Sequence, residues 1–447
     1  MRGLQLIQRI SFISFLTMLW ISLGEAASSN PPWTLPAQKK VLENGLTVIL
    51  EKDESSATTF LEILIKGGKR AEPLGKGGLA YMTTRLAVEI PYTDKVQELM
   101  RLSSRLSVTS RGDYSLINIE CLSSNVEATL KILSKIILDP LFSGLRIDAI
   151  KEYMQHQSKI EEDDSIIVGH VASLRAFFGK TGYEGSIYGD DKSLEATKSK
   201  DIKDFYNTYF IAPNIIFSGS SDLQEGLILR LIEKYFAEIS RGKPVSLDSL
   251  TLLFPDENKT FIERDTKQTL VSLAFPLPKI TPRSYALSCL LENLLGKGPG
   301  SRLWPLRSEE SLAYTVNCRV TQMQEGGILE AYLETDNKKR DIALSALKKV
   351  LAGVYEKGVT ADELQATKTI AKANFLRDNE PKATRTATLA SFEAVGLGFS
   401  YFTELISLID VLPLEEVNAY IRDMLNPEKA FEVVVGPKSG GQEPINP

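Results

Sequence analysis

Three side chains with the spacing of a metal site lie on one predicted helix, within residues 77–90. Tyr81, Thr84 and Arg85 stand three and four positions apart, so they share one helical face. Two histidines and a glutamate in the order H-x-x-E-H can hold a catalytic zinc ion and supply its base. Here the same positions carry a phenol, a hydroxyl and a guanidinium. A guanidinium is a fixed cation without a lone pair, and a hydroxyl is no base at neutral pH, so we predict no zinc on this helix.

The other metal-ligating side chains do not replace this site. On one continuous helix, His156 and His170 would lie about 21 Å apart, whereas zinc ligands gather about 2 Å from the ion. The three cysteines are too few and too scattered for a disulfide framework or a zinc ribbon. Buried free thiols are the simplest interpretation of Cys121, Cys289 and Cys318.

The chain length and the net charge limit which classes of protein are possible. The chain has 447 residues, enough for two or more cores. Its net charge of -5 argues against a nucleic-acid-binding protein, which would normally carry a basic face.

The first 26 residues have the pattern of a secretory signal peptide. Arg2 and Arg9 precede an apolar run over residues 10–23, and small residues lead to Ala26, after which we expect cleavage. The run is short for a membrane-spanning helix, so we expect no stable span in the mature protein. The pattern predicts a periplasmic or secreted protein. A mitochondrial presequence is the alternative, but the run is not amphipathic.

The remaining chain contains one order of elements twice. Each half runs strand, strand, helix, strand pair, several helices and a last strand, which predicts an internal duplication. The first half covers residues 37–242 and the second 259–438, joined by a polar linker at 243–258, and residues 439–447 are expected to be disordered. Strand pairs followed by grouped helices predict two α+β modules, each with a largely antiparallel sheet covered by helices.

Five segments in the right order resemble the M16 peptidase family, the group of pitrilysin and the mitochondrial processing peptidase. Residues 78–85, Gly-Leu-Ala-Tyr-Met-Thr-Thr-Arg, align with the family's G-L-A-H-x-x-E-H. The other matching segments are 42–46, 301–314, 358–364 and 433–437. The resemblance implies a half-shell of two modules, as in LuxS/M16 metallopeptidase-like folds, which clamps against a second half-shell to enclose a chamber.

The resemblance also implies which metal ligands are missing. Active members bind zinc through the two histidines of the motif and a later glutamate. Tyr81, Thr84 and Arg85 replace the first histidine, the glutamate base and the second histidine, and Gln157 falls at the distal glutamate. The chain would then have no catalytic residues and no metal of its own. We expect Tyr81 and Arg85 to form an aromatic–cation pair on the helix surface.

Arg307 and Tyr314 match, with the same spacing, the arginine–tyrosine pair with which active members hold substrate near the metal. A guanidinium can donate hydrogen bonds to a peptide carbonyl, and a phenol can donate to an oxyanion. From the residues alone, a merely structural bridge between helix and strand stays open.

Residues 106–121 are a second candidate for substrate contact. In the family the matching edge strand accepts a peptide by β-augmentation. Ser107 and Val108 stand where the family usually has asparagine and alanine, which counts against direct binding by this half.

Together these residues imply a non-catalytic M16-type subunit that pairs with an H-x-x-E-H homologue as a heterodimer. The homologue would hold the zinc, and this chain would lend Arg307 and Tyr314 to a metalloendopeptidase for unfolded peptides. A structural core subunit, as in mitochondrial complexes, and a stand-alone peptide-binding protein are the alternatives.

Overall fold

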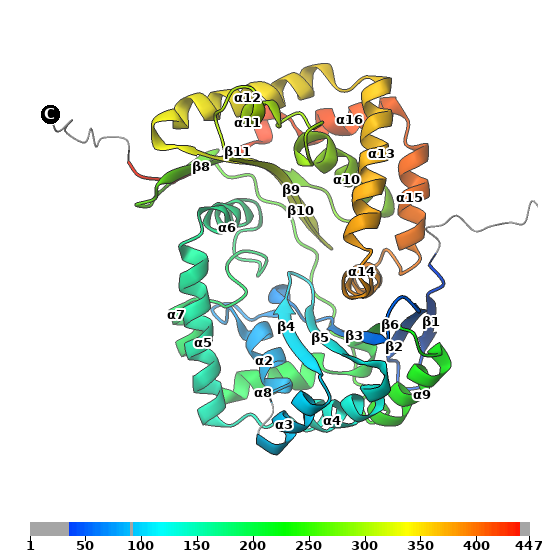
Figure 1. Ribbon diagram of the computed structural model, residues 1–447. Coiled ribbons are helices and arrows are strands. Elements are labelled where there is room, and N and C mark those ends of the chain that lie inside the picture. Colours follow the sequence, from blue (N-terminus) through cyan, green and yellow to red (C-terminus); the bar gives the residue numbers. More distant parts are fainter. Residues whose placement is uncertain (1–34, 90–92, 439–447) are drawn as a thin grey trace, which may run out of the picture. The chain divides into compact units, whose positions relative to one another are not determined.

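The chain folds around two β-sheets with the same topology (Figure 1). The computed structural model describes residues 35–89 and 93–438, so the predicted signal peptide and C-terminal tail lie outside the described residues. The strands of the first sheet are β1 (Gln38–Val41), β2 (Thr47–Lys52), β3 (Thr58–Ile65), β4 (Arg105–Ser110), β5 (Ser115–Leu122) and β6 (Ile215–Ser221). Those of the second are β7 (Lys259–Glu263), β8 (Gln268–Leu277), β9 (Thr315–Met323), β10 (Gly326–Asp336) and β11 (Phe431–Gly436).

The strand orders confirm the predicted duplication and the largely antiparallel sheets, and they add one parallel pairing to each sheet. The first sheet has the order β1-β2-β6-β3-β5-β4 and the second β7-β11-β8-β10-β9, so the second repeats the first without β1. In each half the last strand lies between the first two of the repeat, parallel to one and antiparallel to the other. Both sheets are therefore mixed, with one parallel pairing in each among antiparallel ones. The long helical connection before β6 and β11 sets these directions, and no local pattern reveals them.

Helices cover both sheets. The first half contains α2 (Leu79–Ala87), α3 (Thr93–Arg101), α4 (Val126–Leu138), α5 (Gly144–Glu162), α6 (Ser165–Phe178), α7 (Asp191–Ala196), α8 (Ser199–Tyr209) and α9 (Glu225–Phe236). The second contains α10 (Pro282–Gly296), α11 (Pro305–Ser308), α12 (Arg340–Lys357), α13 (Ala361–Asp378), α14 (Lys382–Ala394), α15 (Tyr401–Val411) and α16 (Leu414–Met424). Short 3-10 turns are η1 (Lys69–Ala71), η2 (Ser123–Asn125), η3 (Ala212–Asn214), η4 (Asn337–Lys339) and η5 (Pro427–Lys429). No helix among those described is long and apolar enough to cross a membrane.

Two helices are exchanged between the halves. Helix α6, from the first half, packs on β8, β10 and β11, whereas α14, from the second half, packs on β3 and β6 (Figure 1). Each exchanged helix brings a basic side chain to a buried carboxylate of the other half. His170 Nδ1 of α6 lies 2.6 Å from Glu330 Oε2 of β10, and Arg385 Nε of α14 lies 2.8 Å from Glu51 Oε2 of β2. Neither sheet is thus covered by its own half alone.

The segment between the halves has no regular structure but is not free. Residues 241–258 form neither helix nor strand. Leu250 and Leu252 nevertheless pack against the core between α6 and the second sheet, and the backbone N–H of Leu253 donates to the carbonyl of Phe177 at 2.8 Å. The segment therefore helps to hold α6 on the second sheet. The domain boundaries at 242 and 259 stay a prediction.

Candidate functional site

The helix that carries the zinc-motif positions, α2, is fixed in place at its N-terminus. Gly78 has a φ of +88°, and a Cβ there would lie 2.8 Å from the carbonyl oxygen of Tyr188, so glycine is required. The carboxylate of Glu72 accepts hydrogen bonds from the backbone N–H groups of Gly78 at 3.2 Å and Ala80 at 2.9 Å. Burial raises the pKa of this carboxyl to about 8, although the two hydrogen bonds and Lys69 favour its charged form. An acceptor at a helix N-terminus satisfies free backbone donors.

Tyr81, at the position of the first histidine, is buried. Only 4% of the residue is exposed, and its ring packs edge-on against that of Tyr188 with 5.0 Å between centroids. Burial raises the pKa of Tyr81, and the neighbouring hydroxyls of Tyr153 and Tyr188 add to this. The expected surface pair with Arg85 is therefore wrong, because the tyrosine ring lies inside the protein.

Thr84 and Arg85 are held by partners on or beside α2. The hydroxyl of the fully buried Thr84 donates to the carbonyl of Ala80 at 2.8 Å. Arg85 Nη1 lies 2.8 Å from one carboxylate oxygen of Glu89, and Arg146 Nη1 of α5 lies 3.1 Å from the other. Arg85 is thus part of an ion-pair cluster that ties α2 to α5. A cation here would repel Zn²⁺, and these three side chains do not fit the ion.

The structure places α5, which carries Gln157, against α2, but the two helices together do not form a metal site. Gln157 is half-buried on α5, which packs on α2, and the exposed His156 precedes it. His170 lies on α6, bound to Glu330. Across residues 35–89 and 93–438, no group of three or more His, Cys, Asp or Glu side chains could hold a metal ion. The match of Gln157 to the distal glutamate stays a prediction.

Tyr153 and Tyr188 are neighbours of Tyr81 that sequence reasoning missed. Tyr153 lies one turn before Gln157 on α5, and its ring packs edge-on against Tyr188 with 6.3 Å between centroids. The position of Tyr153 on α5 could have been noticed from helical spacing. Nothing in the local sequence places Tyr188, in the loop before α7, between these two rings.

The structure brings Arg307 and Tyr314 together. Arg307 Cζ lies 5.0 Å from the ring centroid of Tyr314 and 5.0 Å from that of Trp304, so the guanidinium makes cation–π contacts with two aromatic rings. Tyr314 is 76% exposed. The turn between them contains Ser311 with a φ of +52°, a strained conformation for a serine, and Lys339 Nζ donates to its carbonyl at 3.0 Å.

The two groups of predicted site residues belong to different sheets. Helix α2 lies against α5, α8, β4 and β5 of the first half. Helix α11, which carries Arg307, lies against α12 and β9, and Tyr314 directly precedes β9. Strands β4 and β9 are both edge strands, so each site group lies near a strand with one unpaired side.

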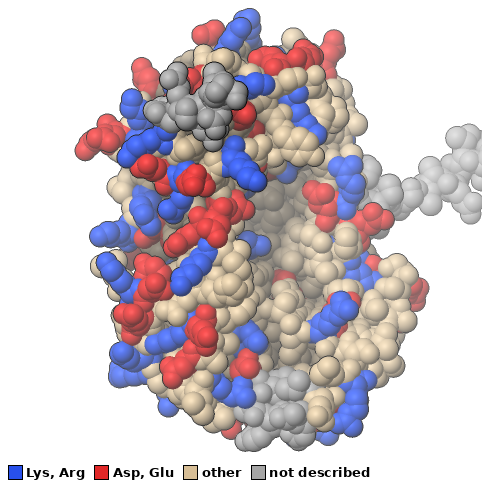
Figure 2. Space-filling model, turned by 60° about the vertical axis from the view of Figure 1, so that its left-hand side comes forward, with Lys and Arg blue, Asp and Glu red and all other residues tan. Residues whose placement is uncertain are grey.

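The surface shows no field of a single sign on the face in view. Figure 2 shows basic and acidic side chains intermingled on this face, and a hollow near its middle with a largely uncharged visible lining. Such a mixed surface gives no electrostatic footprint for nucleic acid.

The fold and the site define a class of protein. It has two α+β modules of one topology, and a first module in which the helix of an inverted zinc motif lacks every metal ligand. A family model described as "Insulinase (Peptidase family M16)" matches residues 47–190, and one described as "Peptidase M16 inactive domain" matches residues 198–371. The chain belongs to the M16 peptidase family.

Among relatives of similar length, some are named zinc proteases and one is named a non-peptidase homologue. A Helicobacter pylori protein named "Non-peptidase homolog YmxG" is 22% identical over 381 residues, which cover 84% of this chain and 88% of that protein. A Bacillus subtilis protein named "Uncharacterized zinc protease YmxG" is 19% identical over 398 residues, covering 88% and 96%. A crystal structure of a peptidase M16 inactive domain from Pseudomonas fluorescens superposes with a TM-score of 0.83 at 21% identity, covering 91% of this chain and 100% of that one. This likeness confirms the predicted α+β fold.

Proposed function

We propose that this chain is a non-catalytic M16 subunit that pairs with a zinc-bearing homologue to form a metalloendopeptidase for unfolded peptides. The observation that carries the proposal is the contrast between the two modules. The first has a buried tyrosine, a buried threonine and a paired arginine at the zinc-motif positions. The second keeps an exposed arginine–tyrosine contact at Arg307 and Tyr314.

The geometry of this pair suits it to binding a peptide carbonyl. Arg307 contacts two rings, and within the described residues its guanidinium forms no ion pair, so its N–H donors stay available. The exposed phenol of Tyr314 can donate to the same group or to the oxyanion that forms from it. The partner's zinc would supply the attacking hydroxide. The two side chains of this chain would orient the carbonyl and stabilise its developing charge.

The test is peptide cleavage by this chain co-expressed with an H-x-x-E-H homologue. We expect Arg307→Ala and Tyr314→Phe each to lower kcat/KM by about 10²-fold, the usual loss for one oxyanion donor. Arg302→Ala is the matched control, because Arg302 is an exposed arginine of the same segment that binds Glu363 at 2.5 Å. We expect this control to leave the rate unchanged.

Three outcomes would reassign the chain. Unchanged rates for both variants in an intact complex would make it a structural subunit. Peptide binding by the chain as a monomer that associates with no H-x-x-E-H homologue would make it a stand-alone binding protein. Zinc at one equivalent in the isolated chain would contradict the absence of a metal site.

We also propose export to the periplasm or outside the cell. The positive residues, apolar run and small residues before Ala27 support this. N-terminal sequencing of the mature protein should begin at Ala27, and an intact or mitochondrially processed N-terminus would contradict it.

A further inference from the structure

A buried carboxylate without a partner lies between the first sheet and α14. Glu62 of β3 is 2% exposed, and neither of its oxygens has a hydrogen-bond partner among the described residues. Leu61 and Ile63, on either side of it, belong to the core under α2. Since side chains alternate along a strand, Glu62 faces the opposite side of the sheet, which α14 covers. An unpaired buried carboxylate is costly, so its presence calls for a ligand or a proton.

Unpartnered hydroxyl groups lie on the strand and helix next to Glu62. Ser218 is its direct neighbour in the pairing of β3 with β6, and Ser220 follows on the same face. Both hydroxyls, and that of Thr386 on α14, are buried without a hydrogen-bond partner in the part of the chain that the structure describes. Several polar atoms at one place therefore lack partners.

A groove of about 500 Å³ opens at this place. Its polar lining consists of Glu62, Thr386, Asn118, Ser107, Glu120 and Arg105. The guanidinium of Arg105 lies 4.0 Å from the carboxylate of Glu120, on the outer side of the groove at the edge strand. In the register of the sheet Glu62 pairs with Asn118, and Asn118 pairs with Ser107, so the polar residues cross the sheet from β3 to the edge strand β4. The groove thus leads from the edge of the sheet to a buried acid.

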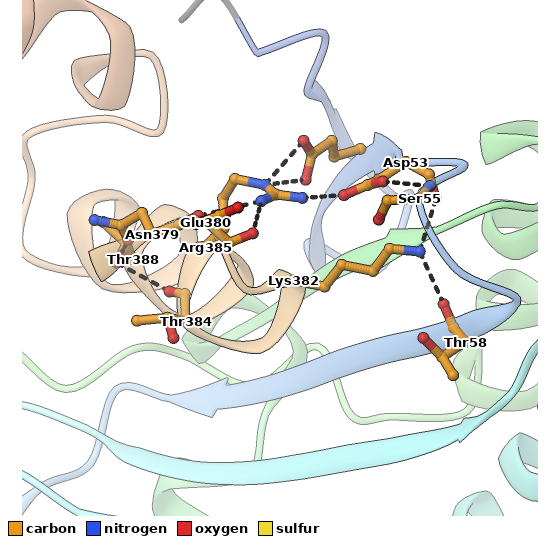
Figure 3. A network of polar contacts seen from close by, with 10 residues as sticks. Asp53, Ser55, Thr58, Asn379, Glu380, Lys382, Thr384, Arg385 and Thr388 are labelled. Atoms are coloured by element: carbon orange, nitrogen blue, oxygen red, sulfur yellow. Dashed lines mark hydrogen bonds and ion pairs between the residues drawn. The ribbon is translucent and has the colours of Figure 1, made fainter. Parts of the chain in front are cut away.

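The nearby basic side chains of α14 are bound elsewhere (Figure 3). Arg385 binds Glu51 and Asp53, and Lys382 Nζ donates to backbone carbonyls, including that of Asp53 at 2.7 Å. Burial raises the pKa of Glu62 to about 8, an effect that the charge of Arg111 only partly offsets. Among the described residues, no basic side chain forms an ion pair or hydrogen bond with this carboxylate.

We propose that this groove binds an alkylammonium or alkylguanidinium group, such as a lysine or arginine side chain of a peptide, with Glu62 as its counter-ion. The side-chain oxygens of Ser218, Thr386 and Asn118 supply further acceptors. One carboxylate among neutral acceptors suits a monovalent organic cation better than Ca²⁺ or Mg²⁺, which takes more oxygen ligands. Because the carboxylate oxygens are almost fully covered, the side chain turns toward the groove when the guest enters.

The test is calorimetric titration of the full chain with two capped pentapeptides, identical except for a central lysine or norleucine. We expect the lysine peptide to bind at least about tenfold more tightly, the worth of one charge-assisted hydrogen bond. Glu62→Gln keeps the shape and cannot become the charged partner of an ammonium group, so it should abolish this preference. Glu43→Gln is the control, an exposed carboxylate of the same half that lies outside the groove, and should keep it.

Equal binding of the two peptides, or a preference that survives Glu62→Gln, would overturn the proposal. A loss of preference in Glu43→Gln as large as in Glu62→Gln would also overturn it, because general negative charge would then suffice. If Glu62→Gln does not fold, Thr386→Val tests the proposal instead. This variant loses one acceptor, so its affinity for the lysine peptide should fall roughly threefold. Arg307→Ala should keep the preference, so a failure here is distinct from a failure of the proposed peptidase role.

Discussion

The guanidinium of Arg385 on α14 binds the carboxylate of Glu51 on β2 at 2.8 Å, although 334 positions separate the two residues in the chain. Arg385 also donates to the carbonyl of Glu380 at 2.6 Å and binds Asp53 (Figure 3). Both members of the main pair are buried. This network holds a helix of the second half on the sheet of the first.

We expect Arg385→Met to destabilise the protein strongly. Methionine leaves the buried carboxylate of Glu51 without its counter-ion, and such a loss costs about 3–5 kcal/mol. The measurement is the free energy of unfolding in urea. Arg302→Met is the control, since its more exposed pair with Glu363 should be worth about 1 kcal/mol or less. Equal losses in the two variants would show that the Arg385 network does not hold α14.

Helix α6, the other helix exchanged between the halves, binds Glu330 through His170, and this contact leads to a prediction at acidic pH. Burial raises the pKa of Glu330, but His170 and Arg319 outweigh this and hold it below its ordinary value of 4.5. A carboxyl group with a lowered folded pKa contributes stability above its unfolded value, and this is lost as pH falls through the folded value. Wild-type stability should therefore drop below pH 4.5 more steeply than that of Glu330→Gln.

Urea midpoints measured from pH 7 to pH 3 test this, with Glu334→Gln on the same strand as the control. Parallel curves for the wild type and Glu330→Gln would contradict the prediction.

Glu62 predicts a pH effect of the opposite sign. Its pKa is raised from 4.5 to about 8, so the unfolded chain loses this proton well before the folded one. Between these values stability falls as pH rises, by up to about 1.4 kcal/mol per pH unit. Glu62→Gln lacks this proton, so its advantage over the wild type should grow from pH 4.5 to about 8 and then level off.

Thermal denaturation across this pH range measures the difference. A constant offset between the two proteins would show that the carboxyl of Glu62 is not protonated in the folded state. Glu62→Gln is also used in the peptide titrations, so its effect on stability and its effect on binding are measured separately.

The prediction that α2 binds no zinc can be tested by restoring ligands. The wild type should hold well below one equivalent of zinc after dialysis against micromolar Zn²⁺, because Arg85 carries no lone pair. The variant with Tyr81→His, Arg85→His and Gln157→Glu has three ligands of the kinds that zinc prefers and should gain about one equivalent. Tyr81→His alone is the control and should gain none. If only a carboxylate at a neighbouring position of α5 restores zinc, Gln157 is not the distal position.

Local patterns determined much of this protein. Leu79, Met82 and Leu86 recur at helical spacing, which predicts one buried face, and all three are buried. The sequence also predicts a strand pair around Gly112 and a helix over residues 166–178, and the structure has both, because periodicity and turn residues act over short stretches. The chemistry of Arg85 alone argued against zinc, since a guanidinium cannot donate an electron pair in any fold.

Only the tertiary structure decided which distant residues meet. It made the sheets mixed, exchanged α6 and α14 between the halves, and placed Tyr188 against a buried Tyr81. It also left Glu62 unpaired beneath α14, which reads in the sequence as one polar residue in an apolar strand. These relationships depend on contacts between segments far apart in the chain. The local sequence around each side chain does not identify its distant partner.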